Sequence, residues 1–431
     1  MSDIQEGCGD LPQRRHARRR TGLIMSAVLA GIAGTCVAVA PGQATPVANI
    51  SMSEETTDVA AFYAAPADRL VGAPGSVIQL RPIDGDPGVE GARNYLVLYR
   101  SVDMRGNTVA VSGTLAVPDG DAPPGGWPLI SWAHGTTGVD DSCAPSHDTS
   151  ADFPAHDYTS LVRKVQAQWI AAGYAVAQTD YQGLGTPGPH GYLIGTAEQR
   201  AVTDMARAAR EVDPEIGTRW VAVGHSQGGQ AAVFTDAQAQ QWAPELQLLG
   251  AVALAPASHQ GIGLQASQMA TNTGAAGALG PLTGGGTAFL PLIIRGAQTV
   301  ADVDPARFLT PRAAAMVSLA DTGCIAQLRD SQEWGGIPPG EVFSPGGDMS
   351  TLTRVLNEND PSTLTFTQPL LVLQGRADTT IPALATDAMV MRQRAAGRPV
   401  QYRAYPGVDH RGVLEASYAD ALSWVNGRFG R

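Results

Sequence analysis

Ser226 stands between two glycines in a segment whose residue types suit nucleophilic catalysis. Residues 220–234 read WVAVGHSQGGQAAVF, so the pattern around the serine is G-x-S-x-G. The apolar run before it is typical of a strand and the alanine-rich run after it of a helix, and a serine on such a turn has its hydroxyl exposed above the end of a sheet. Gly224 and Gly228 fit because so tight a turn leaves no room for flanking side chains. The alternative is a glycine-rich turn with an idle serine, since the chain contains 50 glycines.

Whether Ser226 is catalytic therefore depends on its partners, because a serine hydroxyl is a poor nucleophile without a base that takes its proton. In this type of motif the chain order is serine, acid, histidine. Of eight histidines only His259 and His410 follow Ser226, and no acid at the end of an expected strand precedes His259. His410 lies in YPGVDHRG, after the strand-like residues 400–405. The order of the sequence thus favours His410.

Asp378 is the acid that fits the same order. It lies in LLVLQGRADTTIP, just after a strand-like apolar run, whereas Asp409 is adjacent to His410 and its side chain would point the wrong way to orient that ring. We predict a triad in which His410 takes the Ser226 proton and returns it to the leaving alcohol, while Asp378 fixes the imidazole tautomer. The alternative is a surface His410 and an Asp378 that only caps a helix.

A serine nucleophile also needs amide donors for the oxyanion that forms on the substrate. One is expected from Gln227, directly after the serine, and one from the loop after an earlier strand. That loop reads WAHGTTG (residues 132–138), where Gly135 lets the backbone turn its amides inward and Thr136 is the favoured second donor. The alternative is an ordinary glycine turn.

No cofactor and no metal are expected to take part. His134, His147 and His156 lie in one region, but no pair of them has the helical spacing of metal ligands.

Alternating strand-like and helical segments must position these residues. An antiparallel hairpin is expected over residues 95–117, with DMRGN (103–107) as its turn. Short apolar runs then alternate with helical stretches, a pattern that predicts a parallel sheet with right-handed crossovers. The expected fold is therefore α/β, an α/β-hydrolase with a mostly parallel sheet, an N-terminal antiparallel hairpin and an inserted helical cap. The strand-like runs after the hairpin are 129–132, 174–178, 220–223, 248–254, 369–374 and 400–405.

The alternation stops between residues 258 and 345. A structureless loop of that length is implausible inside a domain, so we expect a cap or lid insertion there, with the core formed by residues 45–257 and 346–431. Its apolar piece, residues 289–294, is expected to pack over Ser226 and line an acyl pocket.

The N-terminal 44 residues resemble an export signal. RRHARRR (residues 14–20) supplies positive charge, and the uncharged residues 22–40 form an apolar run followed by small residues. The apolar run approaches the length of a membrane span, so an uncleaved anchor is the alternative. We expect a protein secreted to the extracellular space or cell envelope.

The net charge limits the kinds of partner that the chain can bind, and its cysteine content indicates the redox compartment. The 431 residues carry 29 basic and 40 acidic side chains, a net charge of −11, which argues against nucleic-acid binding. Beyond the N-terminal segment only Cys143 and Cys324 remain, and two cysteines in an exported chain suggest one disulfide. The alternative is two buried free thiols. Oligomeric state is not indicated.

Together these motifs resemble the secretory lipase family, secreted α/β-hydrolases that include the yeast-type lipase A enzymes. The similar pieces are SCAPSHD (142–148), TDYQGLG (179–185), GHSQGGQAA (224–232), WAPELQLLGAVALAP (242–256) and LLVLQGRADTTIP, and they cover most of the chain from about residue 79. The resemblance implies hydrolysis of carboxylic esters, typically triacylglycerols, a cap that matches residues 258–345 in place and size, and pairing of Cys143 with Cys324. The cap sequence and the HGTTG loop depart from the family pattern.

The expected function is a secreted serine hydrolase, a triacylglycerol lipase or esterase, that cleaves acyl esters or lipids through an acyl-enzyme on Ser226. Transient contact of the cap with a lipid interface is part of that expectation. The alternatives are an acyltransferase or peptidase on the same triad, and an exported binding protein whose triad is silent.

Overall fold

A computed structural model describes residues 59–275, 287–366 and 368–431. The predicted export segment and its alternative, an uncleaved anchor, lie outside these residues. Within them, none of the helices combines the length and the apolar character needed to cross a membrane.

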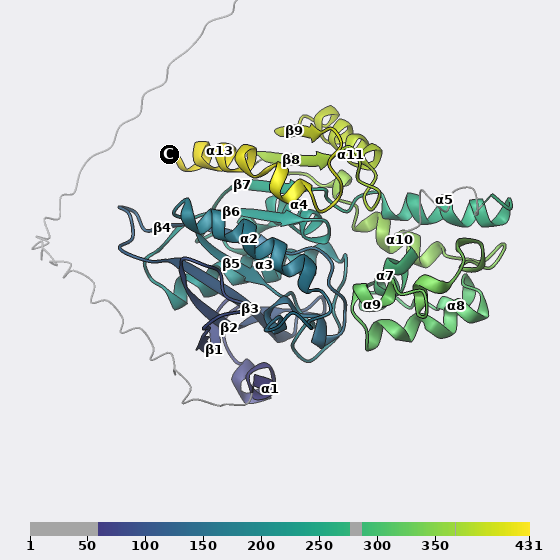
Figure 1. Cartoon of the computed structure of the whole chain (residues 1–431), viewed down its shortest axis with the longest axis horizontal. Coiled ribbons are helices and arrows are strands. Elements are labelled where there is room, and N and C mark those ends of the chain that lie inside the picture. Colours follow the sequence, from purple (N-terminus) through teal and green to yellow (C-terminus); the bar gives the residue numbers. More distant parts are fainter. Residues whose placement is uncertain (1–58, 276–286, 367) are drawn as a thin grey trace, which may run out of the picture. The chain divides into compact units, whose positions relative to one another are not determined.

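A nine-stranded sheet forms the centre of the fold, in the order β1-β2-β3-β5-β4-β6-β7-β8-β9 (Figure 1). Strands β1, β2, β3 and β5 pair antiparallel, and all pairs from β5–β4 to β8–β9 are parallel. The predicted α/β-hydrolase fold, with its hairpin followed by a parallel sheet, is confirmed. The strands are β1 (Val77–Pro82), β2 (Ala92–Val102), β3 (Thr108–Pro118), β4 (Trp127–Ala133), β5 (Ala175–Thr179), β6 (Ile216–His225), β7 (Gln247–Leu254), β8 (Leu370–Gly375) and β9 (Val400–Tyr405).

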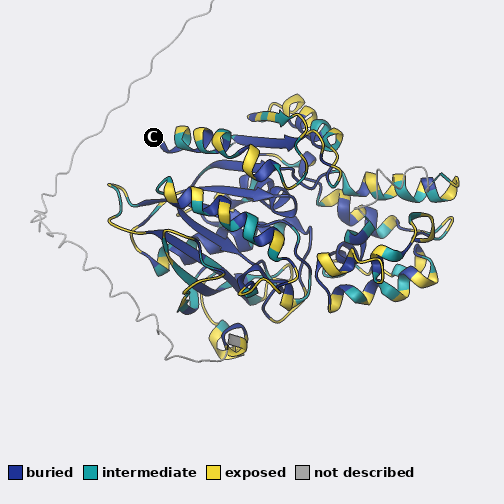
Figure 2. Ribbon diagram, in the orientation of Figure 1, coloured by how far each residue is buried: buried dark blue, intermediate teal, exposed yellow. Residues whose placement is uncertain are grey.

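Helices cover both faces of the sheet, because successive strand side chains point to opposite faces. One face packs α3 (Gly195–Val212), α4 (Gln227–Trp242) and α11 (Ala383–Ala395) against strand residues such as Ala222 and Val372. The other face packs α2 (His156–Ala171), α12 (Val413–Ala416) and α13 (Tyr418–Phe429) against their neighbours, such as Val221 and Leu373. The parallel strands β4, β5 and β8 are therefore buried on both sides, and the central strands are dark blue in Figure 2. The edge strand β9 is partly exposed.

The long connection between β7 and β8 contains helices that pack around an apolar cluster, which also includes residues of the segment 192–197 (Figure 1). One helix, α10 (Ser350–Glu358), begins beyond residue 345 and packs against α5 (Gln260–Asn272) and α7 (Leu290–Gln298). A helical insertion is thus present between the expected strands, while the division of the chain into core and cap at residues 258 and 345 stays a prediction. The insertion contains α5 (Gln260–Asn272), α7 (Leu290–Gln298), α8 (Pro311–Met316), α9 (Ile325–Leu328) and α10 (Ser350–Glu358).

Before β1 lies the short helix α1 (Val59–Tyr63), whose Phe62 and Tyr63 are buried against β2 and β3 residues such as Leu98. Tyr63 also shares a hydrogen bond with Ser146 through their hydroxyls, at 2.9 Å. This segment therefore belongs to the folded domain.

Candidate active site

Ser226 lies at the junction of β6 and α4 in a backbone conformation that non-glycine residues rarely adopt. Its φ is 60° and its ψ −116°, and such strain persists only where the surrounding structure fixes it. The two neighbouring glycines are required by contact distances. A Cβ on Gly224 would lie 2.0 Å from the Gly228 carbonyl oxygen, and one on Gly228 would lie 1.9 Å from the Ala133 oxygen. The sequence folds into this sharp turn because no larger residue fits on either side of the serine.

The structure brings the three predicted triad residues together. Ser226 Oγ lies 2.9 Å from His410 Nε2, and His410 Nδ1 lies 2.7 Å from Asp378 Oδ2. The carboxylate can only accept, so Nδ1 carries the proton and Nε2 accepts from the serine hydroxyl. Their positions follow from the sheet, because Ser226, Asp378 and His410 come after the carboxyl ends of parallel strands β6, β8 and β9.

Asp378 is fully buried and is held by several donors. Its Oδ1 accepts from the amides of Thr380 and Ile381, each at 2.8 Å, and its Oδ2 also accepts from the Gln374 side chain at 3.0 Å. These bonds fix the carboxylate against the His410 ring. Asp409, by contrast, accepts from the Gly412 amide and does not contact that ring through its carboxylate.

The two amides of the HGTTG loop differ in their partners. The Gly135 amide donates to the Tyr158 hydroxyl at 2.6 Å, whereas no acceptor for the Thr136 amide is found among the described residues. The Thr136 hydroxyl shares a hydrogen bond with the Tyr192 hydroxyl at 2.8 Å. Of the two predicted loop donors, Thr136 is therefore the one whose amide is free to bind an oxyanion.

Gln227 supplies the other predicted amide, in the first turn of α4, where an amide has no acceptor within its own helix. Its side chain is anchored in a buried polar cluster. The Gln227 Nε2 group donates to Glu198 at 2.8 Å and to His190 Nε2 at 3.1 Å. Burial lowers the pKa of His190 to about 4 and raises the pKa of Glu198 to about 8, although hydrogen bonds from Gln227 and Leu193 partly oppose the latter shift. Both side chains are therefore neutral at pH 7.

The residues of the site are little exposed. Ser226 is 6% exposed, and the side chain of His410 is 15% exposed. The apolar residues 289–294 contribute Leu290, Ile293 and Ile294 to a buried cluster that also contains Tyr192. Helix α7 thus packs against the segment that contacts the HGTTG loop. That it lines an acyl pocket stays a prediction.

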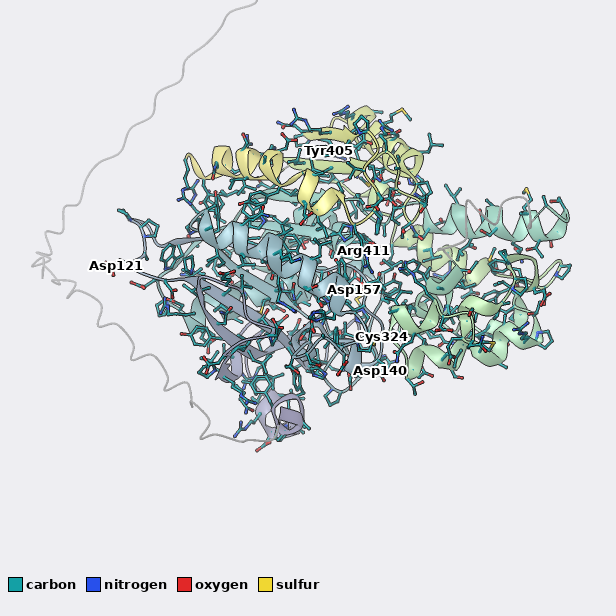
Figure 3. The ribbon with its side chains drawn as sticks, viewed as in Figure 1. Asp121, Asp140, Asp157, Cys324, Tyr405 and Arg411 are labelled. Carbon is teal, nitrogen blue, oxygen red and sulfur yellow. A yellow bond between two sulfur atoms is a disulfide. The ribbon has the colours of Figure 1, made fainter. Side chains whose placement is uncertain are left out.

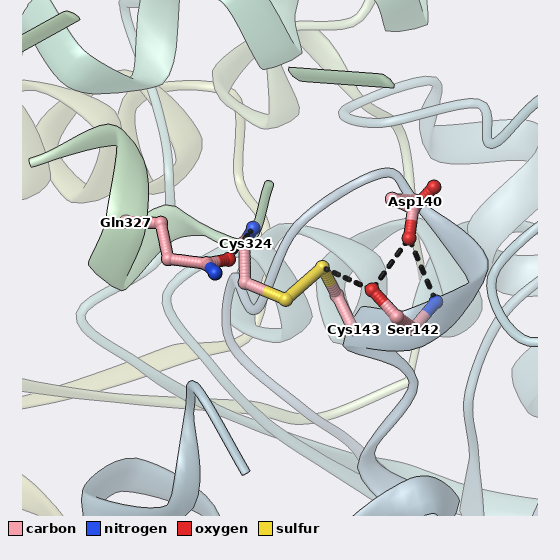
Figure 4. The surroundings of a disulfide bond; sticks show 5 residues. All are labelled: Asp140, Ser142, Cys143, Cys324 and Gln327. Carbon is pink, nitrogen blue, oxygen red and sulfur yellow. Dashed lines mark hydrogen bonds between the residues drawn. A yellow bond between two sulfur atoms is a disulfide. The ribbon is translucent and has the colours of Figure 1, made fainter. Parts of the chain in front are cut away.

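A disulfide joins Cys143 to Cys324, with the Cα atoms 5.5 Å apart (Figure 4). Beside it the Ile325 amide donates to the Thr137 carbonyl at 2.8 Å. Both contacts attach the insertion to the region of the HGTTG loop. Figure 3 labels Cys324 and also Arg411, the neighbour of His410, on the side of the sheet where the insertion lies.

No group of three or more His, Cys, Asp or Glu side chains in the described part of the chain could hold a metal ion. His134 bonds to the Gly135 carbonyl and His156 to Asp148, while the third histidine of the region, His147, stacks edge-on against Tyr63. Each of these three side chains thus contacts another residue of the chain.

Four residues near the site were not predicted: Tyr158, His190, Glu198 and His225. Glu198 and His190 contact Gln227 from distant segments, and no spacing in the sequence relates them to it. His225 lies inside the G-x-S-x-G motif. The one signal that it has a role near the site was that a polar residue stands at the end of a strand that is expected to be buried.

Known proteins resemble this chain in sequence and in fold. The family model described as secretory lipase matches residues 159–284, which include Ser226. Lipase A of Moesziomyces aphidis is 29% identical over 195 residues, 44% of this chain and 41% of that relative, so the match spans less than half of the relative's length. A probable inactive lipase of Mycobacterium tuberculosis is 24% identical over 376 residues, 85% of this chain and 81% of the relative.

Solved structures agree on the fold. Lipase A of Candida antarctica in its closed state has a TM-score of 0.66 at 19% identity, covering 86% of this chain and 85% of its own. The rice cell wall degrading esterase LipA from Xanthomonas oryzae has a TM-score of 0.63 at 18% identity, covering 83% of this chain and 98% of its own. The resemblance to the secretory lipase family that the sequence motifs indicated is confirmed.

Proposed function

We propose that this chain, which resembles the secretory lipases in sequence and in fold, is a secreted serine hydrolase that cleaves carboxylic esters through an acyl-enzyme on Ser226. The observation that carries the proposal is the continuous hydrogen-bonded chain from Ser226 Oγ through the His410 ring to the buried Asp378 carboxylate. Acyl esters, triacylglycerols among them, are the proposed substrates.

The proposed reaction uses each group at a stated atom. Ser226 Oγ attacks the ester carbonyl carbon as its proton passes to His410 Nε2, and the carbonyl oxygen becomes an oxyanion that the Gln227 and Thr136 amides stabilise. The C–O bond to the alcohol then breaks, and the leaving oxygen takes the proton from His410. A water molecule reverses these steps on the acyl-enzyme, releasing the carboxylic acid and restoring Ser226. Asp378 keeps the ring in the required tautomer throughout.

The buried nucleophile supports a further part of the proposal, that residues 258–345 form a cap over the site. Ser226 is only 6% exposed, which is consistent with a covering segment that moves when an ester binds. Transient contact of that cap with a lipid interface belongs to the same proposal, as does export of the chain.

Hydrolysis of chromogenic acetate, butyrate and octanoate esters beside a matched anilide tests this function. We expect ester turnover, little anilide turnover, and labelling of Ser226 by a fluorophosphonate probe. Ser226→Ala should abolish labelling and lower kcat by roughly 10⁴-fold or more, because triad members act as a unit. Ser258→Ala is the matched control, since Ser258 is equally buried but its hydroxyl has no partner in the described residues. Near-normal turnover by Ser226→Ala would contradict the mechanism. Because one relative is named a probable inactive lipase, the activity of this chain has to be measured directly.

A further inference from the structure

His225, the residue before the proposed nucleophile, is buried with both ring nitrogens engaged. It is 1% exposed. Its Nε2 lies 2.8 Å from the backbone carbonyl oxygen of His410, and its Nδ1 lies 3.1 Å from the Tyr158 hydroxyl. The ring centres of His225 and His410 are 4.6 Å apart. His225 therefore contacts the backbone of the proposed general base and, through Tyr158, the loop on the other side of the serine.

One arrangement of protons satisfies every group in this network. A carbonyl oxygen only accepts, so His225 Nε2 carries the proton and Nδ1 of the neutral ring must accept. The Tyr158 hydroxyl then donates to Nδ1, and its oxygen accepts from the Gly135 amide at 2.6 Å. No donor or acceptor in the chain from Gly135 to the His410 carbonyl is left over.

The network also holds His225 neutral. Burial, and then the neighbouring His410, lower the pKa of His225 well below its ordinary value. This neutrality matters for the proposed reaction, because His410 becomes cationic when it takes the serine proton. A second cation with its ring centre 4.6 Å away would oppose that step.

We propose that His225 and Tyr158 are positioning residues that fix the His410 backbone and the HGTTG loop in one mutual geometry around Ser226. The inference rests on the proposed function. The Asp378 carboxylate holds the His410 ring at Nδ1, while His225 holds the His410 main chain, so the two contacts together determine where Nε2 lies. Tyr158 ties the same network to Gly135, the residue before the free Thr136 amide. His225 and Tyr158 thus hold both the proposed general base and the loop that carries the proposed oxyanion donor.

Two substitutions at His225 test whether its hydrogen bonds position His410 or whether its ring only fills space in the core. His225→Gln retains an amide donor for the His410 carbonyl and an oxygen that accepts from Tyr158, whereas His225→Leu removes both. We expect His225→Leu to lower kcat for an acetate ester by about 10- to 100-fold, since displacements of about 1 Å have effects of that order. KM should change by no more than about threefold. The rate of fluorophosphonate labelling should fall by the same factor as kcat, and His225→Gln should restore most of it.

Tyr158→Phe tests the other half of the network and stands in if His225→Leu does not fold. It should lower kcat about tenfold without raising KM, because it removes the hydroxyl between His225 and Gly135. Tyr99→Phe is the matched control: its hydroxyl is also buried, and it bonds to Thr179 and Ala201 and not to the site.

The proposal is overturned if His225→Gln and His225→Leu lose equal kcat, if the losses appear in KM alone, or if Tyr99→Phe reproduces the effect of Tyr158→Phe. Melting temperatures of all variants show whether a loss of kcat follows a loss of folding. Failure of the proposed function is a separate outcome, because the wild type itself would then show neither ester turnover nor probe labelling.

Discussion

The ionisation of Glu198 should change the activity and the stability of this protein with pH, and this change tests the site beside Gln227. This carboxyl group is 1% exposed and accepts hydrogen bonds from the Gln227 side chain at 2.8 Å and the Leu193 amide at 3.0 Å. Burial raises its pKa from 4.5 to about 8, while the two hydrogen bonds act in the opposite direction. Glu198 is therefore protonated at pH 7 and ionised at pH 9.

The consequence for activity follows from the charge that appears above pH 8. One glutamine side chain and one hydrogen bond separate the carboxyl from the Gln227 amide, a span of roughly 8 Å to an oxyanion bound there. Two negative charges at about that distance repel by about 2 kcal/mol at an effective dielectric constant of about 20. This corresponds to roughly a 30-fold loss of kcat.

The consequence for stability has the same sign. The folded chain holds this proton more tightly than the unfolded chain, so the stabilising contribution is complete below pH 4.5 and declines as pH rises to about 8. Its loss amounts to about 1.4 kcal/mol per pH unit at most. Glu198→Gln removes the titration while keeping an oxygen that accepts from Gln227.

The assay is kcat and melting temperature against pH, from pH 6 to 10, for wild type, Glu198→Gln and the control Glu215→Gln. Glu215 lies three residues after the end of the same helix α3 and is exposed. We expect the wild type and the control to lose kcat above pH 8 and to lose stability between pH 6 and about 8, and Glu198→Gln to lose less of both. Superimposable profiles for wild type and Glu198→Gln would refute this reasoning, because they would show that Glu198 carries no titrating proton there.

The remaining predictions concern the disulfide, the oxyanion loop and the insertion. Cys143→Ser should lower the free energy of unfolding by up to about 5 kcal/mol, because the bond closes a loop between residues 181 apart. Denaturant titration measures this loss, and peptide mapping that finds the thiols of Cys143 and Cys324 free in the purified wild type would contradict it. Gly135→Ala should lower kcat, since its Cβ would lie 2.5 Å from the Tyr158 hydroxyl; unchanged kcat would count against that contact. Ile293→Asp should reduce kcat/KM for octanoate esters more than for acetate, because it places a charge in an apolar cluster. Equal losses across the ester series would show that this segment does not line the acyl site.

The triad geometry was accessible from sequence because it depends on order and on strand ends. Ser226 lies at the end of a strand-like run, and Asp378 and His410 each follow such a run by a few residues. Parallel strands bring their carboxyl ends to one edge of a sheet. The position of Ser226 in the chain then left two histidines, and the absence of an acid at an expected strand end before His259 left His410. Local residue types therefore determined which side chains could meet, and the structure shows Ser226 Oγ and His410 Nε2 at 2.9 Å.

Elements whose position depends on packing between residues far apart in the chain were harder to predict from the sequence. Strand β1 (Val77–Pro82) was not predicted, since its residues alternate only weakly and it forms by pairing with the longer β2. Helix α10 begins beyond the expected end of the insertion, and its packing on α5 and α7 is a tertiary contact that no residue pattern indicated. Glu198 gave no signal at all: on an amphipathic helix a glutamate ordinarily faces solvent, and burial here follows from the cluster with His190 and Gln227.

The HGTTG loop shows where residue types alone stop being informative. A glycine after a strand permits amides to turn inward, and on that ground Gly135 and Thr136 were both candidate donors. What separates them is the Tyr158 hydroxyl, 23 residues further along the chain, which already accepts from the Gly135 amide. That hydroxyl is held in place by His225, and His225 by the carbonyl of His410. In the proposed mechanism the same side chains that leave Thr136 as the oxyanion donor also position the base, so a substitution that frees the Gly135 amide should also disturb His410.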